Sequence, residues 1–213
     1  MAKSKSPSIW HTLSTDKNLK MRIALGFSAA INLWFIVAEF VNGALQWSLW
    51  SRSLGVYYLL LITLKVFLIV RSRRGMSAAQ EATTARAVGI VLLVLNMVLI
   101  GMFVQMVVRN NAPKYIEVIL AAIVVFALYR IIAVGVSMVR FRGVKRPTWL
   151  AIKAINLVAG LVALLMVQRT LIAMIIGEAE IARILNSAGG LVVFSVVLWI
   201  AIWLIRGKDW RRR

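Results

Sequence analysis

Long apolar stretches alternate with short polar connections along the whole chain. Each stretch is long enough for the roughly 20 apolar residues that a helix needs to cross a bilayer. The six stretches lie at about residues 22–45, 53–71, 87–108, 116–140, 148–176 and 181–206. This pattern predicts an all-α, polytopic membrane protein with six transmembrane helices and no soluble domain.

Three of these stretches share one phrase, an arginine followed ten residues later by an asparagine. Ten helical residues rise about 15 Å, half of a hydrocarbon core of about 30 Å. The pairs are Arg22 with Asn32, Arg86 with Asn96, and Arg146 with Asn156. We therefore expect three helices to enter from one basic side, each with an amide near the middle of the membrane.

The phrase extends into a repeat, because each of these stretches is followed by a returning stretch that ends at Arg-Gly. A basic residue suits the negative C-terminal end of a helix, and glycine suits the next position. The predicted ends are Arg74-Gly75, Arg142-Gly143 and Arg206-Gly207. This pattern favours three helical hairpins, with coincidence among helices that all need an inner arginine as the alternative.

These boundaries divide the chain into three parts. A basic cytoplasmic arm covers residues 1–21, and a basic cytoplasmic tail covers 207–213. Between them, the six-helix transmembrane domain covers residues 22–206. Its predicted hairpins lie at 22–75, 86–143 and 146–207.

Charge sets the orientation of these helices. The chain is 62% hydrophobic and has 26 basic against 7 acidic residues, a formal net charge of +19. The basic residues gather in the arm, in the second and fourth connections and in the tail, so the positive-inside rule places both termini in the cytoplasm. We expect a multi-pass plasma-membrane protein whose basic face meets anionic headgroups, and we do not expect nucleic-acid binding.

Candidate chemistry is sparse. The chain has no cysteine, and its one histidine, His11, lies in the arm beside Trp10. It contains no phosphate-binding loop, no zinc-protease motif and no hydrolase motif. The sequence therefore predicts no enzyme activity, no cofactor and no metal site.

Buried amides are the first candidate site residues. Hydrocarbon offers an amide no hydrogen-bond partner, so Asn32, Asn96 and Asn156 are expected to bond to neighbouring helices. This role as interhelical glue is the favoured interpretation. A polar substrate pathway is the alternative, and Gln168 with Arg169 extends it into the outer half of the fifth stretch.

Ionisable residues inside the stretches are the stronger candidates for function, because burying a charge in a membrane is costly. Lys65 and Lys153 lie close enough to a basic end to snorkel to the interface. Arg130 and Glu39 are not placed to reach an interface in this way, and we expect them to form a buried ion pair. That pair would be either a structural element or part of a transport pathway.

Aromatic residues near the first outer turn have a simpler interpretation. Trp47, Trp50, Tyr57 and Tyr58 cluster there. Tryptophan and tyrosine are enriched at membrane interfaces, where one part of the ring is apolar and the other is wet. The pattern predicts an interfacial aromatic belt.

Two stretches also carry a resemblance to known proteins. Residues 32–74 and the segment Arg140-Phe-Arg-Gly-Val-Lys-Arg-Pro-Thr-Trp-Leu-Ala-Ile-Lys-Ala-Ile-Asn-Leu resemble a small uncharacterised family of six-helix bacterial membrane proteins, found mainly in Gram-positive bacteria. The layout is more distantly similar to the membrane domain of cation diffusion facilitators. The first resemblance implies the six-helix fold and carries no activity.

The second resemblance lacks the residues that would give it a function. Cation diffusion facilitators bind metal through His and Asp residues four apart on their second and fifth helices. The comparable faces here carry Tyr57, Tyr58 and Ile62, and then Lys153, Asn156 and Gly160. Divalent metal transport by that mechanism is therefore not expected.

Two functional hypotheses follow. The first is a small transporter-like or channel-like bundle for an anionic or zwitterionic solute or lipid, since basic residues outnumber Glu39 within the stretches. The second is a non-transporting membrane scaffold or assembly partner. A homodimer or a membrane protein partner is compatible with both.

Overall fold

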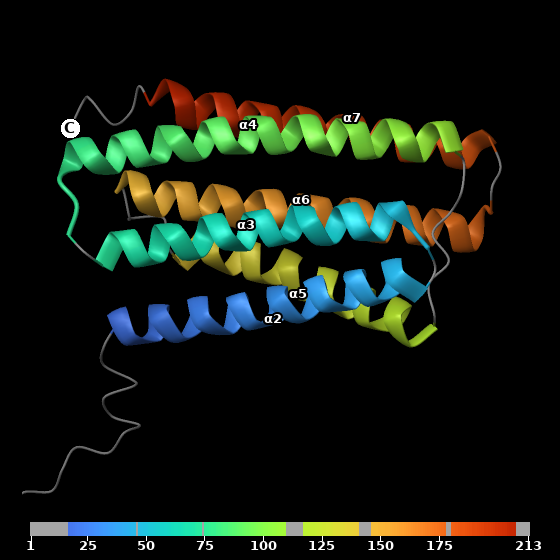
Figure 1. Ribbon diagram of the computed structural model, residues 1–213, viewed down its shortest axis with the longest axis horizontal. Helices are drawn as coiled ribbons and strands as arrows, with labels where there is room; N and C mark the ends of the chain where they lie inside the picture. The colour runs from blue at the N-terminus through green and yellow to red at the C-terminus, as the bar shows by residue number, and fades with distance from the viewer. Residues whose placement is uncertain are drawn as a thin grey trace, which may run out of the picture.

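The computed structural model describes residues 17–45, 47–73, 75–109, 117–140, 146–177 and 180–207. Over these residues the chain forms six helices and no strand (Figure 1), which confirms the predicted all-α class. They are α2 (Lys17–Leu45), α3 (Leu49–Arg73), α4 (Ala78–Arg109), α5 (Glu117–Arg140), α6 (Pro147–Ile175) and α7 (Glu180–Arg206). Residues 1–16 of the predicted arm and 208–213 of the predicted tail lie outside the described residues.

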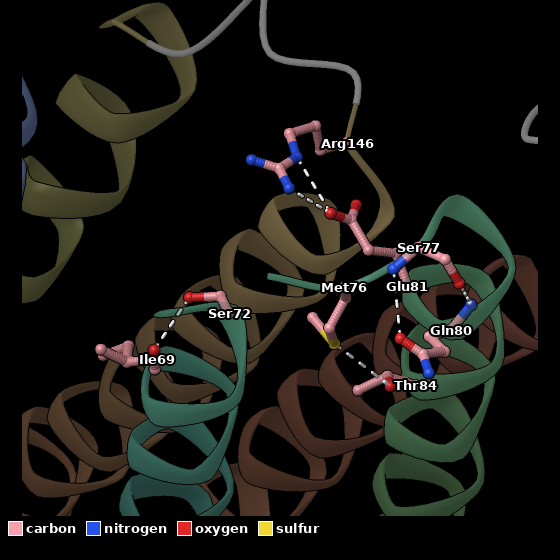
Figure 2. A network of polar contacts seen from close by, with 8 residues as sticks. All are labelled: Ile69, Ser72, Met76, Ser77, Gln80, Glu81, Thr84 and Arg146. Carbon is pink, nitrogen blue, oxygen red and sulfur yellow. Dashed lines mark hydrogen bonds and ion pairs between the residues drawn. The ribbon is translucent and has the colours of Figure 1, made fainter. Parts of the chain in front are cut away.

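Most helix bounds fall within a few residues of the predicted stretches, and α4 is the exception. It begins at Ala78, nine residues before the apolar stretch that starts at 87. The Ser77 hydroxyl accepts from the Gln80 amide at 3.3 Å, and the Gln80 side chain accepts from the Ser77 amide at 3.1 Å (Figure 2). This capping box starts a polar first segment that hydropathy does not register.

Other helix ends follow their local sequences. Gly75 and Gly207, just beyond α3 and α7, have φ angles of 69° and 51°, a conformation that glycine adopts without steric cost. α6 starts with Pro147 after an extended Arg146, and proline suits the first helical position. Gly143 lies outside the described residues.

The six helices form three layers of two (Figure 1). α4 and α7 form one outer layer, α3 and α6 the middle layer, and α2 and α5 the other outer layer. α2, α4 and α6 run in one direction, and α3, α5 and α7 run in the other. Each of the first three helices therefore packs antiparallel against the helix three places later in the chain.

This arrangement corrects the predicted second hairpin, 86–143. Among the described residues, α4 and α5 share no substantial interface, whereas α4 makes the largest interface in the bundle with α7. The chain passes from one outer layer to the other between α4 and α5. Of the three predicted hairpins, only α2–α3 and α6–α7 pack as neighbours.

The close approach of α4 to α7 at Gly89 explains why these two helices pack together. A Cβ atom at Gly89 of α4 would lie 2.9 Å from the carbonyl oxygen of Ala201 and 3.0 Å from Cβ of Leu204. Such close approach is how membrane helices gain packing energy, because lipid is as apolar as their side chains. Asn96 of α4 also donates to the Phe194 carbonyl of α7 at 3.3 Å.

α6 is the central helix, and it packs against α3, α4, α5 and α7. The fraction of its apolar segment that is buried is 61%, against 33–39% for the other three long apolar helices. These four helices, α3, α4, α6 and α7, are long and apolar enough to cross a membrane. α2 and α5 carry shorter apolar segments in their described parts, at Ala30–Leu45 and Val124–Val136.

An ion pair joins the starts of α4 and α6 (Figure 2). Nε of Arg146 donates to Oε1 of Glu81 at 3.0 Å, and a second guanidinium nitrogen contacts the same oxygen. Glu81 is buried, while the Arg146 side chain is 60% exposed. An acidic residue also suits the positive N-terminal end of α4.

Replacing Gly89 tests the α4–α7 interface. We expect Gly89→Val to lower the free energy of unfolding by about 1–3 kcal/mol, because the added atoms meet the backbone of α7. The matched control is Gly101→Val on the same helix, where a Cβ would meet nothing within 4 Å. Thermal unfolding in detergent measures both, and equal unfolding temperatures would contradict the packing described here.

Candidate functional site

Polar side chains recur at seven-residue spacing on the facing sides of α2 and α3. They are Asn32 and Glu39 on α2, and Ser51, Tyr58 and Lys65 on α3. Seven residues make almost two helical turns, so each set lies along one helix face. All five are buried. We call these five residues the polar seam.

A small cavity lies at one end of the polar seam, between α2, α3, α5 and α6. Its polar lining comes from Asn32, Tyr58, Lys65, Arg130 and Asn156. Leu61, Ile62, Ile155 and Ala159 complete the wall. Its volume of about 10 Å³ is close to the room that one water molecule needs. We call it the central cavity.

The central cavity is electropositive. Lys65 and Arg130 are only 1% and 3% exposed, and none of the described lining residues is acidic. Nε of Arg130 has no hydrogen-bond partner, and the guanidinium lies 5.6 Å from the centre of the Phe126 ring. Two buried basic side chains facing one small space would each be stabilised in the charged form by a negative occupant.

Three aromatic rings pack against one another beside the central cavity, and one of them, Tyr58, lines it. Phe35 stacks on Phe126 with ring centres 4.1 Å apart and meets the edge of Tyr58 at 4.8 Å. Phe35 lies between Asn32 and Glu39 along α2. We call Phe35, Tyr58 and Phe126 the aromatic layer.

This layer explains why the expected ion pair between Glu39 and Arg130 is not formed. Arg130 lies in the central cavity, whereas Glu39 lies seven residues beyond Asn32, about 10 Å along α2. Glu39 is fully buried, and neither of its carboxylate oxygens has a hydrogen-bond partner in the described part of the chain. The two candidates therefore belong to different ends of the polar seam.

The remaining basic candidates differ from one another. Lys65 does not snorkel to an interface, because its face of α3 turns inward to α5 and α6, where it lines the central cavity. Lys153 is half-buried on α6 and is not among the residues that line that cavity. Of the two lysines that we expected to behave alike, only Lys65 belongs to the candidate site.

The three asparagines do not lie at one site. Asn32 and Asn156 meet at the central cavity, and Oδ1 of Asn32 has no hydrogen-bond partner there. Asn96 lies elsewhere, in the α4–α7 interface. The shared spacing from arginine to asparagine therefore does not mark one common site.

The C-terminal half of α6 packs against neighbouring helices. Gln168 donates to the Leu185 carbonyl of α7 at 3.0 Å. Arg169 is 5% exposed, and its guanidinium lies 4.4 Å from the centre of the Trp50 ring, a favourable cation–π distance. These two candidates connect α6 to its neighbours and lie apart from the central cavity.

Tyr57 and Tyr58 are not interfacial, contrary to the predicted aromatic belt. Both are buried in the core, and the Tyr58 hydroxyl donates to the Ala159 carbonyl of α6 at 2.9 Å. Trp47, in contrast, is 82% exposed at the turn between α2 and α3. The seven-residue spacing of Ser51, Tyr58 and Lys65 is the sequence signal that would have identified Tyr58 as a site residue.

Comparison with known proteins adds no assignment, since the chain matches no family model, no curated protein and no solved structure at a significant level. The resemblances to the Gram-positive six-helix family and to cation diffusion facilitators stay predictions. The described residues also contain no group of three or more His, Cys, Asp or Glu side chains that could hold a metal ion. The site is therefore interpreted from its own geometry.

Two neighbouring tyrosines offer a matched test of the core. We expect Tyr58→Phe to lower the free energy of unfolding by about 1 kcal/mol, because α3 loses its hydrogen bond to α6. Tyr57→Phe is the control, since the Tyr57 hydroxyl is buried without a partner and its removal is neutral or stabilising. Thermal unfolding in detergent compares them, and a larger loss for Tyr57→Phe would contradict this assignment.

Proposed function

We propose that this protein is a transporter-like membrane protein that binds a small anion in the central cavity. The observation that carries the proposal is the pair of buried basic side chains, Lys65 and Arg130, that line one small space with no acidic residue among the described lining. Neutral donors at the same place, from Asn32 and Asn156, suit an anion as well. A cavity of about 10 Å³ fits a monatomic ion such as chloride better than a larger solute.

The proposed topology has six membrane spans with both termini in the cytoplasm of a bacterial plasma membrane. The layered arrangement supports it, because α2 and α5 run alongside four helices that are long and apolar enough to cross. α2 has 29 residues and α5 has 24, and either helix would extend over more than about 30 Å. The basic connections of the sequence then face the cytoplasm.

The helix order supports transport over a purely structural role. α2, α3 and α4 each pack antiparallel against α5, α6 and α7, respectively. Many transporters consist of two inverted repeats, with the substrate site near the midplane where the repeats meet. The central cavity has this position, between α2 and α3 of the first unit and α5 and α6 of the second. A scaffold has no need of a charged cavity there.

The aromatic layer supplies a barrier in this proposal. Phe35 comes from the first three-helix unit and Phe126 from the second, so rocking one unit against the other would separate the stacked rings. The cavity would then open toward the end where α2 finishes. Stacked rings that part in this way give alternating access without unfolding a helix.

Single cysteines test the topology in a chain that has none of its own. With a maleimide that cannot cross membranes, we expect Ser77→Cys to react only from the cytoplasmic side, and Ser48→Cys and Ile176→Cys only from outside. Whole cells and inverted vesicles provide the two sides. Reaction of Ser48→Cys and Ser77→Cys from the same side would show that α3 does not span.

Substitution of Arg130 tests the anion site. In proteoliposomes, we expect Arg130→Gln to reduce chloride flux by about tenfold or more, because one of two cations is lost. Arg130→Lys should retain part of the flux, and Arg183→Gln, at an exposed position on α7, should retain all of it. Size-exclusion profiles and circular dichroism verify folding. Wild-type flux in folded Arg130→Gln would refute the anion site and favour the scaffold role.

Binding is measured separately from flux. A ligand that binds only the folded protein raises its unfolding temperature. We therefore expect chloride, exchanged for a large organic anion at constant ionic strength, to stabilise the wild type and not Arg130→Gln. Equal stabilisation of both proteins would locate the anion elsewhere.

A further inference from the structure

We propose that Glu39, with Asn42 and Ser51, forms a proton-binding site separate from the central cavity. In this site the Glu39 carboxylate takes up one proton to become a carboxylic acid, and it returns the proton when the stacked rings of the aromatic layer separate. The site itself rests on the geometry below. Its coupling to anion movement rests also on the function proposed above.

Burial without a counter-ion is the first argument. Glu39, Asn42 and Ser51 are all fully buried. Both carboxylate oxygens of Glu39 and Oδ1 of Asn42 have no hydrogen-bond partner among the described residues. A carboxylate without a cationic partner is strongly disfavoured in a membrane interior. The arrangement seen here therefore suits the neutral, protonated acid.

The second argument is the set of groups around Glu39. Asn42, on the same helix as Glu39, donates to the Ser51 hydroxyl oxygen at 3.0 Å. The hydroxyl hydrogen of Ser51 can therefore turn toward Glu39. Ser51 borders the Glu39 carboxyl across the α2–α3 contact. The Ser51 hydroxyl can donate to the ionised carboxylate, and the Asn42 amide oxygen can accept from the protonated acid.

No charged side chain that the structure describes on the neighbouring helices neutralises Glu39. On α3, Arg52 donates instead to the Gly43 carbonyl at 3.0 Å and lies 5.4 Å from the Trp47 ring. Tyr58, also on α3, donates to the Ala159 carbonyl. On α5, Arg130 lies beyond the aromatic layer in the central cavity, with Tyr129 as its neighbour in sequence. None of the described charged groups balances the charge of the Glu39 carboxylate, so protonation is what removes that charge.

The site suits a proton better than a metal cation. Hard cations such as Ca²⁺ and Mg²⁺ take about six or more oxygen ligands. Here the oxygen atoms come only from one carboxylate, one amide and one hydroxyl, and the hydroxyl oxygen already accepts from Asn42. A proton needs a single acceptor, which either oxygen of Glu39 provides.

The position of the site suggests what the proton does. Asn32 in the cavity and Glu39 lie on one face of α2, on opposite sides of the aromatic layer. One anion in the cavity and one proton on Glu39 together add no net charge to the bundle. Movement of both through the membrane would therefore avoid the cost of carrying a lone charge.

Infrared difference spectroscopy of the purified full-length protein tests the proton site directly. We expect wild-type protein to show the carbonyl band of a protonated carboxyl that disappears as the pH rises. Glu39→Gln, which keeps the shape of the neutral acid, should lack this band, and Glu81→Gln should keep it. A band that survives in Glu39→Gln, or a Glu39 that stays ionised even at acid pH, would overturn the proposal.

Proton movement tests the coupling. In proteoliposomes that contain a pH-sensitive dye, a chloride gradient should drive protons through the wild type, and Glu39→Gln should lower that proton flux by about tenfold. The same variant should still be stabilised by chloride. A titrating Glu39 band without chloride binding would defeat the anion proposal alone, whereas undiminished proton flux in Glu39→Gln would defeat the coupling role of Glu39.

Discussion

The apolar interior of this helical bundle supplies few hydrogen-bond partners, and the rest of the structure depends on that constraint. Every buried polar group must find its partner inside the bundle or carry a cost. Several of them do: Tyr58 donates to a carbonyl of α6, Asn96 and Gln168 donate to carbonyls of α7, and Arg169 lies on the ring of Trp50. Buried atoms without a described hydrogen-bond partner occur at several other residues too, and those at Glu39, Arg130 and Asn32 are functional candidates because they lie along the polar seam and the central cavity.

The same constraint connects the packing with the proposed mechanism. α4 and α7 pack closely through Gly89 and form the most extensive interface, so they are suited to remain together. α2 and α5 share a smaller contact, and its stacked rings, Phe35 and Phe126, are apolar and easily separated. Polar groups line both sides of this ring pair. A bundle built in this way can open on one side of the layer while its α4–α7 contact persists.

The predictions from sequence succeeded where local chemistry decides the outcome. Helix bounds followed from apolar length, and the ends at Gly75 and Gly207 followed from the Arg-Gly pairs. The start of α4 was misjudged because its first turns are polar and are held by the Ser77–Gln80 capping box. Tyr57 and Tyr58 were misjudged because composition cannot tell an interfacial ring from a core ring, and only the partners of α3 bury them.

Sequence by itself determined the all-helical class, the six helices of the described residues and the list of polar residues that a membrane interior would have to accommodate. Tertiary structure alone decided which of these residues meet. Contacts between helices distant in the chain pair α4 with α7 in place of α5. They also bring Lys65 and Arg130 to one cavity and keep Glu39 apart from Arg130. Helical periodicity assigns a residue to a face, but the neighbour of that face is set by the packing of the whole bundle.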